Sequence, residues 1–198
     1  IVLRMGKFNS SKLNFHNKNI IDYSTSSWRS DFMDYYLGYK SSFCISTQTG
    51  MDCFARLFRK PFGTIVNPIE DIFYFQKNWN HIFGFINDID KNKILKLDDV
   101  ISNKLHLLST LQKIDESKYK LIKNKKDEIL DLVEEVCNSH EKQNNIKNED
   151  RKLEKLFWNK FLKNKLTKKK ITQLGMDDQL EINANICLKF LEKNKHLL

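Results

Sequence analysis

The stretch SFCISTQTGMDCFARLFRKPFGTIVNP, residues 42–68, decides the fold that we expect for this chain. Its apolar run 43–45 is typical of a short buried strand, and a helical pattern of apolar side chains starts at Met51. Pro61 limits this helix because the residue before a proline disfavours helical backbone, and a second apolar run follows at 62–66. A strand, a helix and a second strand in this order predict one β-α-β unit with parallel strands.

The small polar turn between the first strand and the helix is a candidate anion site. It consists of Ser46, Thr47, Gln48, Thr49 and Gly50. In such a unit the carboxyl end of the strand meets the amino end of the helix, where backbone N–H groups and the helix dipole favour negative charge. Three hydroxyl groups add further donors, and a glycine lets a ligand approach the backbone. A phosphate or diphosphate would therefore fit here, although many α/β domains have such turns and bind nothing at them.

Length and composition indicate a globular protein of 198 residues, 40% of them hydrophobic. No run of eighteen apolar residues occurs, so we expect no transmembrane segment. The net charge is +9, but Lys and Asn are spread along the chain together with Ile, a pattern that an AT-rich genome also produces, so we expect no specific nucleic-acid contact. The four cysteines have no C-x-x-C spacing, which indicates reduced thiols in a cytosolic protein, without a disulfide or a zinc site.

The aliphatic run at residues 1–5 predicts a first strand that places Arg4 at the carboxyl edge of the sheet. There Arg4 could fork onto a diphosphate, or it could form an ion pair with a neighbouring acid. Since the chain opens directly on this strand without an initiator Met, we expect a fragment whose upstream half is missing.

Residues 20–24 predict a second strand, and Ser30 or Asp31 can cap a helix that stops at Gly38. Asp34 lies within this helix, where a solvated helix face is the structural alternative to a functional role. The aromatic-rich segment 69–96 shows no long period and is interpreted as an irregular loop that covers a ligand or packs against another domain.

The remainder of the chain alternates short apolar runs with amphipathic segments. The expected elements are one or two short helices at 97–111, a strand at 119–123, a helix at 125–137, a linker at 138–150, a helix at 153–162 that buries Leu156, Phe157, Phe161 and Trp158, a solvated loop at 167–170 and a short helical piece at 186–191. We therefore predict an α/β fold, a Rossmann-like parallel sheet of about five strands with helices on both faces. Residues 1–137 would form this domain, and residues 138–198 would form a helical C-terminal extension.

The order of these segments resembles a bacterial family of glycosyltransferases that is assigned mainly by similarity and is found near surface-polysaccharide genes. The resemblance covers nearly the whole chain through VLRMG, IIDYSTSSWRSDFMDYYLG, FCISTQTGMDCFARLFRKP, LIKNKKDEILDLVEEV, KLFWNKF and NICLKFLEKNKHLL. It implies half of a GT-B architecture, in which two Rossmann-like halves enclose a cleft. This chain would be the carboxyl-terminal, donor-binding half, and its partner would be the missing N-terminal, acceptor-binding half.

The resemblance also implies site residues. Arg4 stands in the R-M-G motif, and Asp22 with Tyr23 in the I-D-Y strand. The R-x-D-F-x-D segment contains Arg29, Asp31 and Asp34. The S-T-x-T-G turn contains Ser46, Thr47, Thr49 and Gly50. The chain departs from the family at residues 184–187, where Ala-Asn-Ile-Cys replaces a serine-containing turn.

If the resemblance holds, the chain binds a nucleotide-sugar donor for surface-polysaccharide biosynthesis. Arg4 would be the catalytic cation that stabilises the diphosphate leaving group, residues 46–50 would cradle the phosphates, and Arg29 and Asp34 would contact the substrate. No metal and no cofactor are expected, and the general base would come from the missing half. The protein would be cytoplasmic, either free or peripheral to the inner membrane. The alternative is a non-catalytic α/β module that binds a protein partner through its aromatic segment 69–96.

Overall fold

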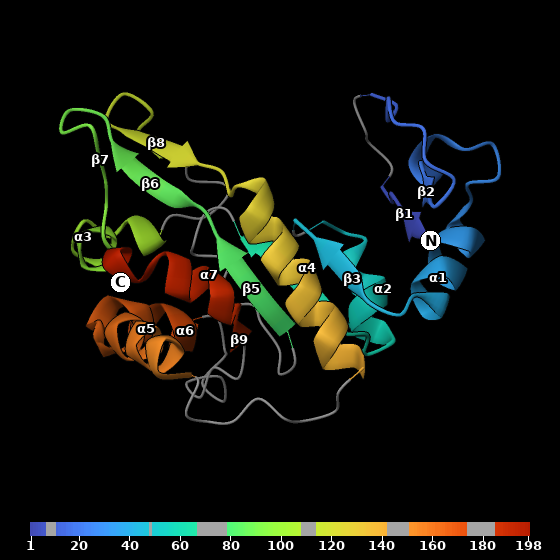
Figure 1. The fold of residues 1–198 in the computed structure, drawn as a ribbon. Helices are drawn as coiled ribbons and strands as arrows, with labels where there is room; N and C mark the ends of the chain where they lie inside the picture. Colours follow the sequence, from blue (N-terminus) through green and yellow to red (C-terminus); the bar gives the residue numbers. More distant parts are fainter. Residues whose placement is uncertain (7–10, 48, 67–78, 108–113, 142–150, 174–184) are drawn as a thin grey trace.

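The computed structural model describes residues 1–6, 11–47, 49–66, 79–107, 114–141, 151–173 and 185–198. At its centre lies a four-stranded parallel sheet with the strand order β3-β4-β5-β9 (Figure 1). The strands are Cys44–Ser46 (β3), Phe62–Val66 (β4), Trp79–Phe83 (β5) and Asn185–Ile186 (β9). The predicted α/β fold with a parallel sheet is confirmed, and the described residues contribute four strands to this sheet, where about five were expected. This arrangement is consistent with a Rossmann-like fold.

The β-α-β unit at residues 42–68 is formed as the sequence predicts. Strand β3 pairs in parallel with β4, with Ser46 opposite Thr64, and the helix Asp52–Leu57 (α2) connects them. The helix ends where Arg59 adopts a positive φ of 51°, which allows the Lys60 N–H to donate to the Ala55 carbonyl at 2.9 Å. This left-handed C-terminal turn satisfies carbonyl groups that the helix leaves free.

The first two strands do not join this sheet. Val2–Leu3 (β1) and Ile20–Ile21 (β2) pair only with each other among the described strands, in parallel. The expectation that the first strand and β3 lie in one sheet is therefore wrong. The turn Tyr23–Thr25 (η1) follows β2. We call residues 1–6 and 11–40 the N-terminal unit.

The helix Asp31–Lys40 (α1) completes the N-terminal unit. Its cap is Ser30, whose hydroxyl accepts the Met33 N–H at 3.2 Å, as the sequence predicts. The helix continues through Gly38 instead of stopping there. A Cβ atom on Gly38 would lie 2.6 Å from Cβ of Phe54, so the glycine serves the close packing of α1 against α2.

The described part of segment 69–96 is not a loop, which corrects the interpretation from the sequence. All five residues of β5 are buried, so this strand lacks the alternation of polar and apolar side chains that identifies a half-exposed strand. A second, antiparallel sheet follows with the order β7-β6-β8. Its strands are Phe85–Asp88 (β6), Lys93–Ile94 (β7) and Tyr119–Ile122 (β8). Residues 69–78 lie outside the described residues.

The helical elements in the rest of the chain are Leu97–Ser102 (α3), Leu105–Leu107 (η3), Lys126–Glu141 (α4), Lys152–Lys163 (α5), Lys165–Gln173 (α6), Leu188–Lys193 (α7) and Lys195–Leu197 (η6). Three expectations are corrected here. Residues 167–170 belong to α6 and not to a loop, and Leu156 is exposed while its neighbours Phe157 and Trp158 are buried. Strand β9 pairs with β5, so the residues after 137 complete the sheet and are not purely a helical extension.

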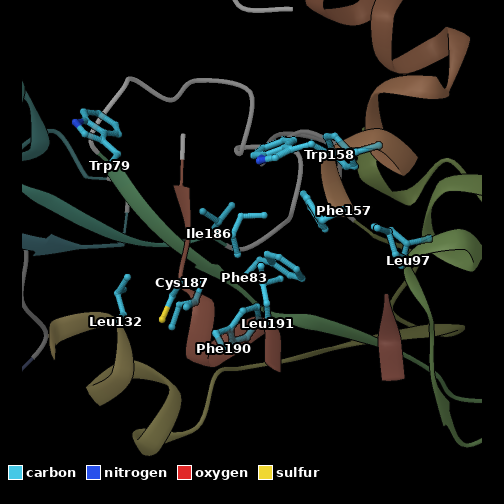
Figure 2. Close-up of a cluster of buried hydrophobic side chains, with 14 of the residues drawn as sticks. Trp79, Phe83, Leu97, Leu132, Phe157, Trp158, Ile186, Cys187, Phe190 and Leu191 are labelled. Atoms are coloured by element: carbon cyan, nitrogen blue, oxygen red, sulfur yellow. The ribbon is translucent and has the colours of Figure 1, made fainter. Parts of the chain in front are cut away.

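The core forms where β5 meets helices from distant parts of the chain. Phe83 lies at the end of β5, with its ring centroid 5.3 Å from that of Phe157 on α5 and 4.9 Å from that of Phe190 on α7 (Figure 2). Helix α4 packs on the sheet through Leu132 and Val136, both fully buried. Side chains separated by a hundred positions therefore hold the parallel sheet together.

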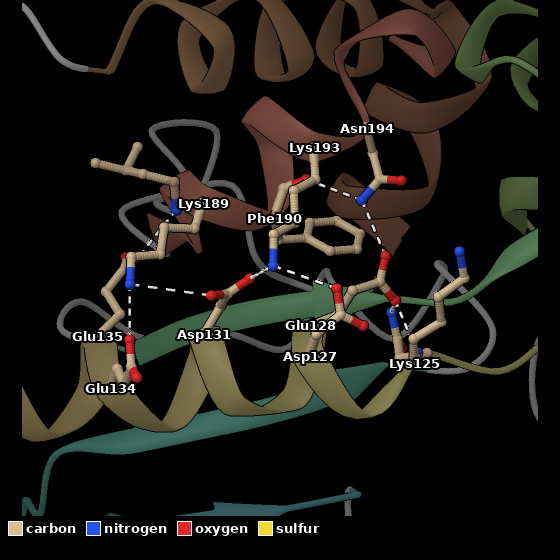
Figure 3. Close-up of polar contacts among 12 residues, drawn as sticks. Lys125, Asp127, Glu128, Asp131, Glu134, Glu135, Lys189, Phe190, Lys193 and Asn194 are labelled. Atoms are coloured by element: carbon tan, nitrogen blue, oxygen red, sulfur yellow. Dashed lines mark hydrogen bonds and ion pairs between the residues drawn. The ribbon is translucent and has the colours of Figure 1, made fainter.

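Helix α4 joins α7 through charged side chains (Figure 3). Lys193 pairs with Asp131 and with Asp127, the latter at 3.3 Å, and Lys189 pairs with Glu134 at 2.6 Å. The acidic face of α4 is thus directed partly at α7, and this contact fixes the last helix beside the sheet.

Candidate functional site

The turn after β3 is organised around a carboxylate. The side chain of Asp52, the first residue of α2, accepts the Ser46 hydroxyl on one oxygen and the Thr49 N–H on the other, the latter at 3.1 Å. In return, the Asp52 N–H donates to the Thr49 carbonyl at 3.0 Å. Gln48, one of the predicted site residues, lies outside the described residues, and no polar contact of the Thr47 side chain is found among those described.

Sequence reasoning missed Asp52, although a signal for it was present. Thr49 is followed three residues later by Asp52, and this S/T-x-x-acid spacing is typical of a capping box at a helix start. Burial raises the pKa of Asp52, while the hydrogen bonds from Ser46 and Thr49 act in the opposite direction. A phosphate entering the turn would have to take these donors from Asp52. The carboxylate itself retains acceptor capacity, which suits the hydroxyl groups of a sugar or a ribose.

Gly50 marks the open side of this turn. A Cβ atom added to it would meet no described atom within 4 Å, and its backbone does not adopt a positive φ. The fold therefore does not require a glycine here, and the space beside the backbone is accessible to a ligand.

Arg4 lies in a separate cluster at the end of β1. Its guanidinium donates to the Ser11 carbonyl at 2.9 Å and to the Asp22 carboxylate at 3.2 Å. Asp22 also accepts the Leu13 N–H at 2.9 Å. Hydrogen bonds from the Ser24 hydroxyl and from Leu13 hold the pKa of Asp22 below its usual value against the effect of desolvation, and Arg4 adds to this. The structure thus pairs Arg4 with an acid, which was the alternative left open by the sequence.

Arg29 and Asp34 form the third cluster. Their ion pair measures 3.2 Å, and Asp34 is only 6% exposed, so the alternative of a solvated helix face is wrong for this residue. The fully buried Tyr23 lies beside them, with its hydroxyl donating to the Ser30 carbonyl at 3.2 Å. Burial raises the pKa of Tyr23, and the Asp34 carboxylate adds to that effect. One oxygen of Asp34 has no hydrogen-bond partner among the described residues.

The structure therefore brings the predicted residues together only in part. Ser46, Thr49 and Gly50 share one turn, whereas Arg4 belongs to the separate sheet of β1 and β2 and bonds to Asp22. A joint role of Arg4 and the turn at one carboxyl edge required β1 and β3 to lie in one sheet, and they lie in two. Asp31 is exposed at the start of α1.

A D-x-D sequence and an apolar pocket are weaker candidates for a functional site. Asp88 and Asp90 have the D-x-D spacing that can hold a cation, but Asp88 is buried and accepts the Lys91 N–H at 3.1 Å, which closes a turn. Within the described ranges, no group of three or more His, Cys, Asp or Glu side chains is placed to hold a metal ion. A pocket beside β6 is lined by Phe85, Leu97, Val100, Leu121 and Phe190, and Asn194 is the one polar side chain among its described lining residues.

The chain was compared with family models, curated proteins and solved structures. No protein-family model matches this chain, and searches of curated proteins and of solved structures also find no match. In the part of the chain that the structure describes, every helix is too short or too polar to cross a bilayer.

Proposed function

We propose that this chain is the donor-binding half of a glycosyltransferase and that it binds a nucleotide-sugar at the carboxyl end of β3. The observation that carries the proposal is the turn with Ser46, Thr49 and Gly50, which joins β3 of the parallel sheet to α2 and is open beside Gly50. In open parallel sheets, ligands bind outside the carboxyl ends of the strands. The sequence resemblance to glycosyltransferases supports the same assignment.

The chemistry of glycosyl transfer suggests separate tasks for the residues of this turn. Breaking the bond between the sugar and the diphosphate leaves negative charge on the diphosphate, and backbone amides beside Gly50 would stabilise it. Asp52 would accept a hydrogen bond from a sugar or ribose hydroxyl. Arg4 can act as the catalytic cation only after it releases Asp22. Because the acceptor and the general base would lie in another half, the chain alone is expected to bind a donor without turning it over.

Calorimetric titration with UDP, GDP and CMP tests this proposal. We expect one of these nucleotides to bind, and Gly50→Val to weaken its binding about tenfold or more because the new side chain fills the open space beside the backbone. The melting temperature of Gly50→Val should stay at the wild-type value, since the fold leaves room for the side chain. Lys169→Ala, on α6 and outside the turn, serves as the control and should bind like the wild type.

Two results would contradict the proposal: no binding of any of the three nucleotides, or equal affinity of Gly50→Val and wild type. The variant Arg4→Ala tests separately whether Arg4 contacts the bound nucleotide. A loss of about 1.5–3 kcal/mol in binding would place Arg4 on the ligand, as expected for a charge-assisted hydrogen bond, whereas unchanged affinity would leave it as the partner of Asp22.

The alternative of a protein-binding module with an aromatic surface at 69–96 loses support in the described part of that segment. Trp79 and Phe83 are 7% and 4% exposed, so their rings belong to the core and not to a surface.

A further inference from the structure

Helix α1 carries a stripe of aromatic rings that faces solvent. Phe32, Tyr36 and Tyr39 are 73%, 41% and 52% exposed, and their spacing of four and three positions places them on neighbouring parts of one helix face. The rings of Phe32 and Tyr36 are stacked, with centroids 6.1 Å apart. We call these three side chains the aromatic ridge.

The flank of α1 next to the ridge packs against the α2 region, and Tyr39 of the ridge itself meets the ring of Phe58 there, with centroids 5.3 Å apart. Gly38 packs against Phe54, and the ring of Tyr35 meets the rings of Phe54 and Phe58 of the α2 region at 5.6 and 4.9 Å. The ridge is therefore presented by a helix that is packed on a second helix. Helix α1 lies at the periphery of the molecule, away from the central strands (Figure 1).

Two ammonium groups converge at the carboxyl end of the ridge. Nζ of Lys40 lies 5.4 Å from the ring centroid of Tyr39 and 5.9 Å from that of Tyr36, and Nζ of Lys60 lies 5.6 Å from the Tyr39 ring. Neither lysine forms an ion pair with a carboxylate among the described residues. The exposed acid of α1, Asp31, stands at the opposite end of the helix. Positive charge is thus concentrated beside the rings, and no carboxylate of the described residues pairs with it.

We propose that the aromatic ridge, with Lys40 and Lys60, docks this protein on an anionic membrane surface. Amphipathic rings are favoured at the depth of lipid headgroups, and lysines beside them attract anionic lipids. An exposed ridge on a peripheral helix suits a flat lipid interface, whereas extended and helical peptides are commonly recognised in a groove or at a sheet edge. The inference rests on α1 and the end of α2 and is independent of the nucleotide-sugar proposal.

Flotation with lipid vesicles tests the inference on the whole chain. The wild type should bind vesicles that contain phosphatidylglycerol about tenfold or more better than vesicles of phosphatidylcholine alone, and added salt should reduce this preference. The double variant Phe32→Ser with Tyr36→Ser should lose about tenfold or more of the binding, since it removes the rings. Lys40→Gln with Lys60→Gln should remove the preference for the anionic lipid.

Matched variants separate docking from loss of structure. Phe32→Leu keeps an apolar side chain and should retain binding, and Leu156→Ser, which changes an exposed leucine on α5, should bind like the wild type. All variants should melt like the wild type because the changed side chains are exposed or, for Lys60, half-buried at the surface. Vesicle binding that is absent in the wild type, or equal in the wild type and the double ring variant, overturns the proposal. A dimer that Phe32→Ser dissociates, without vesicle binding, would show that a second copy covers the ridge instead.

Discussion

The N-terminal unit and the sheet core use the same kind of side chain in opposite ways. Of the fifteen large apolar side chains that are exposed in the described residues, nine lie in the N-terminal unit, Phe32 among them. In the core, Phe62, Phe157, Phe161 and Phe190 are completely buried. Since aromatic burial is a major source of folding free energy, the core stabilises the molecule, while the exposed rings of the N-terminal unit, such as Phe32, remain available for contacts.

The charged side chains differ in the same way. In the N-terminal unit, the described ion pairs, Arg29 with Asp34 and Arg4 with Asp22, span five and 18 positions. The core region also has local pairs, such as Arg151 with Glu154, but in addition it has pairs that join distant elements, such as Lys193 and Asp131, 62 positions apart. Local pairs shape one segment, whereas distant pairs hold the tertiary arrangement of α4 and α7 (Figure 3).

Truncation of one phenylalanine in each region gives the largest expected difference. Phe157→Ala should lower the free energy of unfolding by about 3–5 kcal/mol, because it removes a fully buried ring that stacks on Phe83 and Phe161. Phe32→Ala should change it by no more than about 0.5 kcal/mol, because that ring is in water. Urea unfolding of both variants measures the difference, and similar losses would show that the N-terminal unit is also part of the stabilising core.

A buried histidine in the core should make the free energy of unfolding depend on pH. His81 on β5 is fully buried and hydrogen-bonded to Thr64, and burial lowers its pKa to about 3. The unfolded chain binds a proton near pH 6.5 and the folded chain does not, so the stability from this group is complete above pH 6.5 and decreases as the pH falls towards 3. The expected slope is about 1.4 kcal/mol per pH unit within this range.

Urea unfolding at several pH values tests the role of His81. His81→Gln should lose this part of the pH dependence, whatever its effect on stability at neutral pH. His16→Gln changes an exposed ring of the N-terminal unit and should leave the slope as in the wild type. A wild-type slope in the His81 variant would assign the acid sensitivity to other groups.

Two glycines give the smallest of the three expected effects. Gly63→Ala should destabilise the protein by about 1–3 kcal/mol, because the added Cβ would lie 2.7 Å from Ile45 and 2.9 Å from Val136 at the contact of α4 with the sheet. Gly50→Ala, in the open turn, should leave the melting temperature near the wild-type value. Calorimetric melting compares the two. If Gly63→Ala is neutral, the packing of α4 on β4 is looser than the structure indicates.

The sequence by itself determined the elements whose signals are local. The apolar runs around Pro61 and the polar turn at 46–50 predicted the unit of β3, α2 and β4, and Ser30 predicted the start of α1. These predictions succeed because caps, turns and short apolar runs depend on neighbouring residues. For the site, the same signals gave the turn, but they did not give Asp52 as the acceptor of its donors or Asp22 as the partner of Arg4.

Only the tertiary structure decided which segments complete the sheet and which side chains meet. Strand β5 is buried on both faces, so its sequence lacks the alternation that marks a half-exposed strand. Strand β9 is two residues long and becomes a strand through its pairing with β5. Helix α6 has a lysine-rich sequence and buries only a narrow face, on which Thr167 donates to or accepts from His106 at 2.8 Å. In each case the stabilising partner lies far away in the sequence, and a pattern of neighbouring residues cannot specify it.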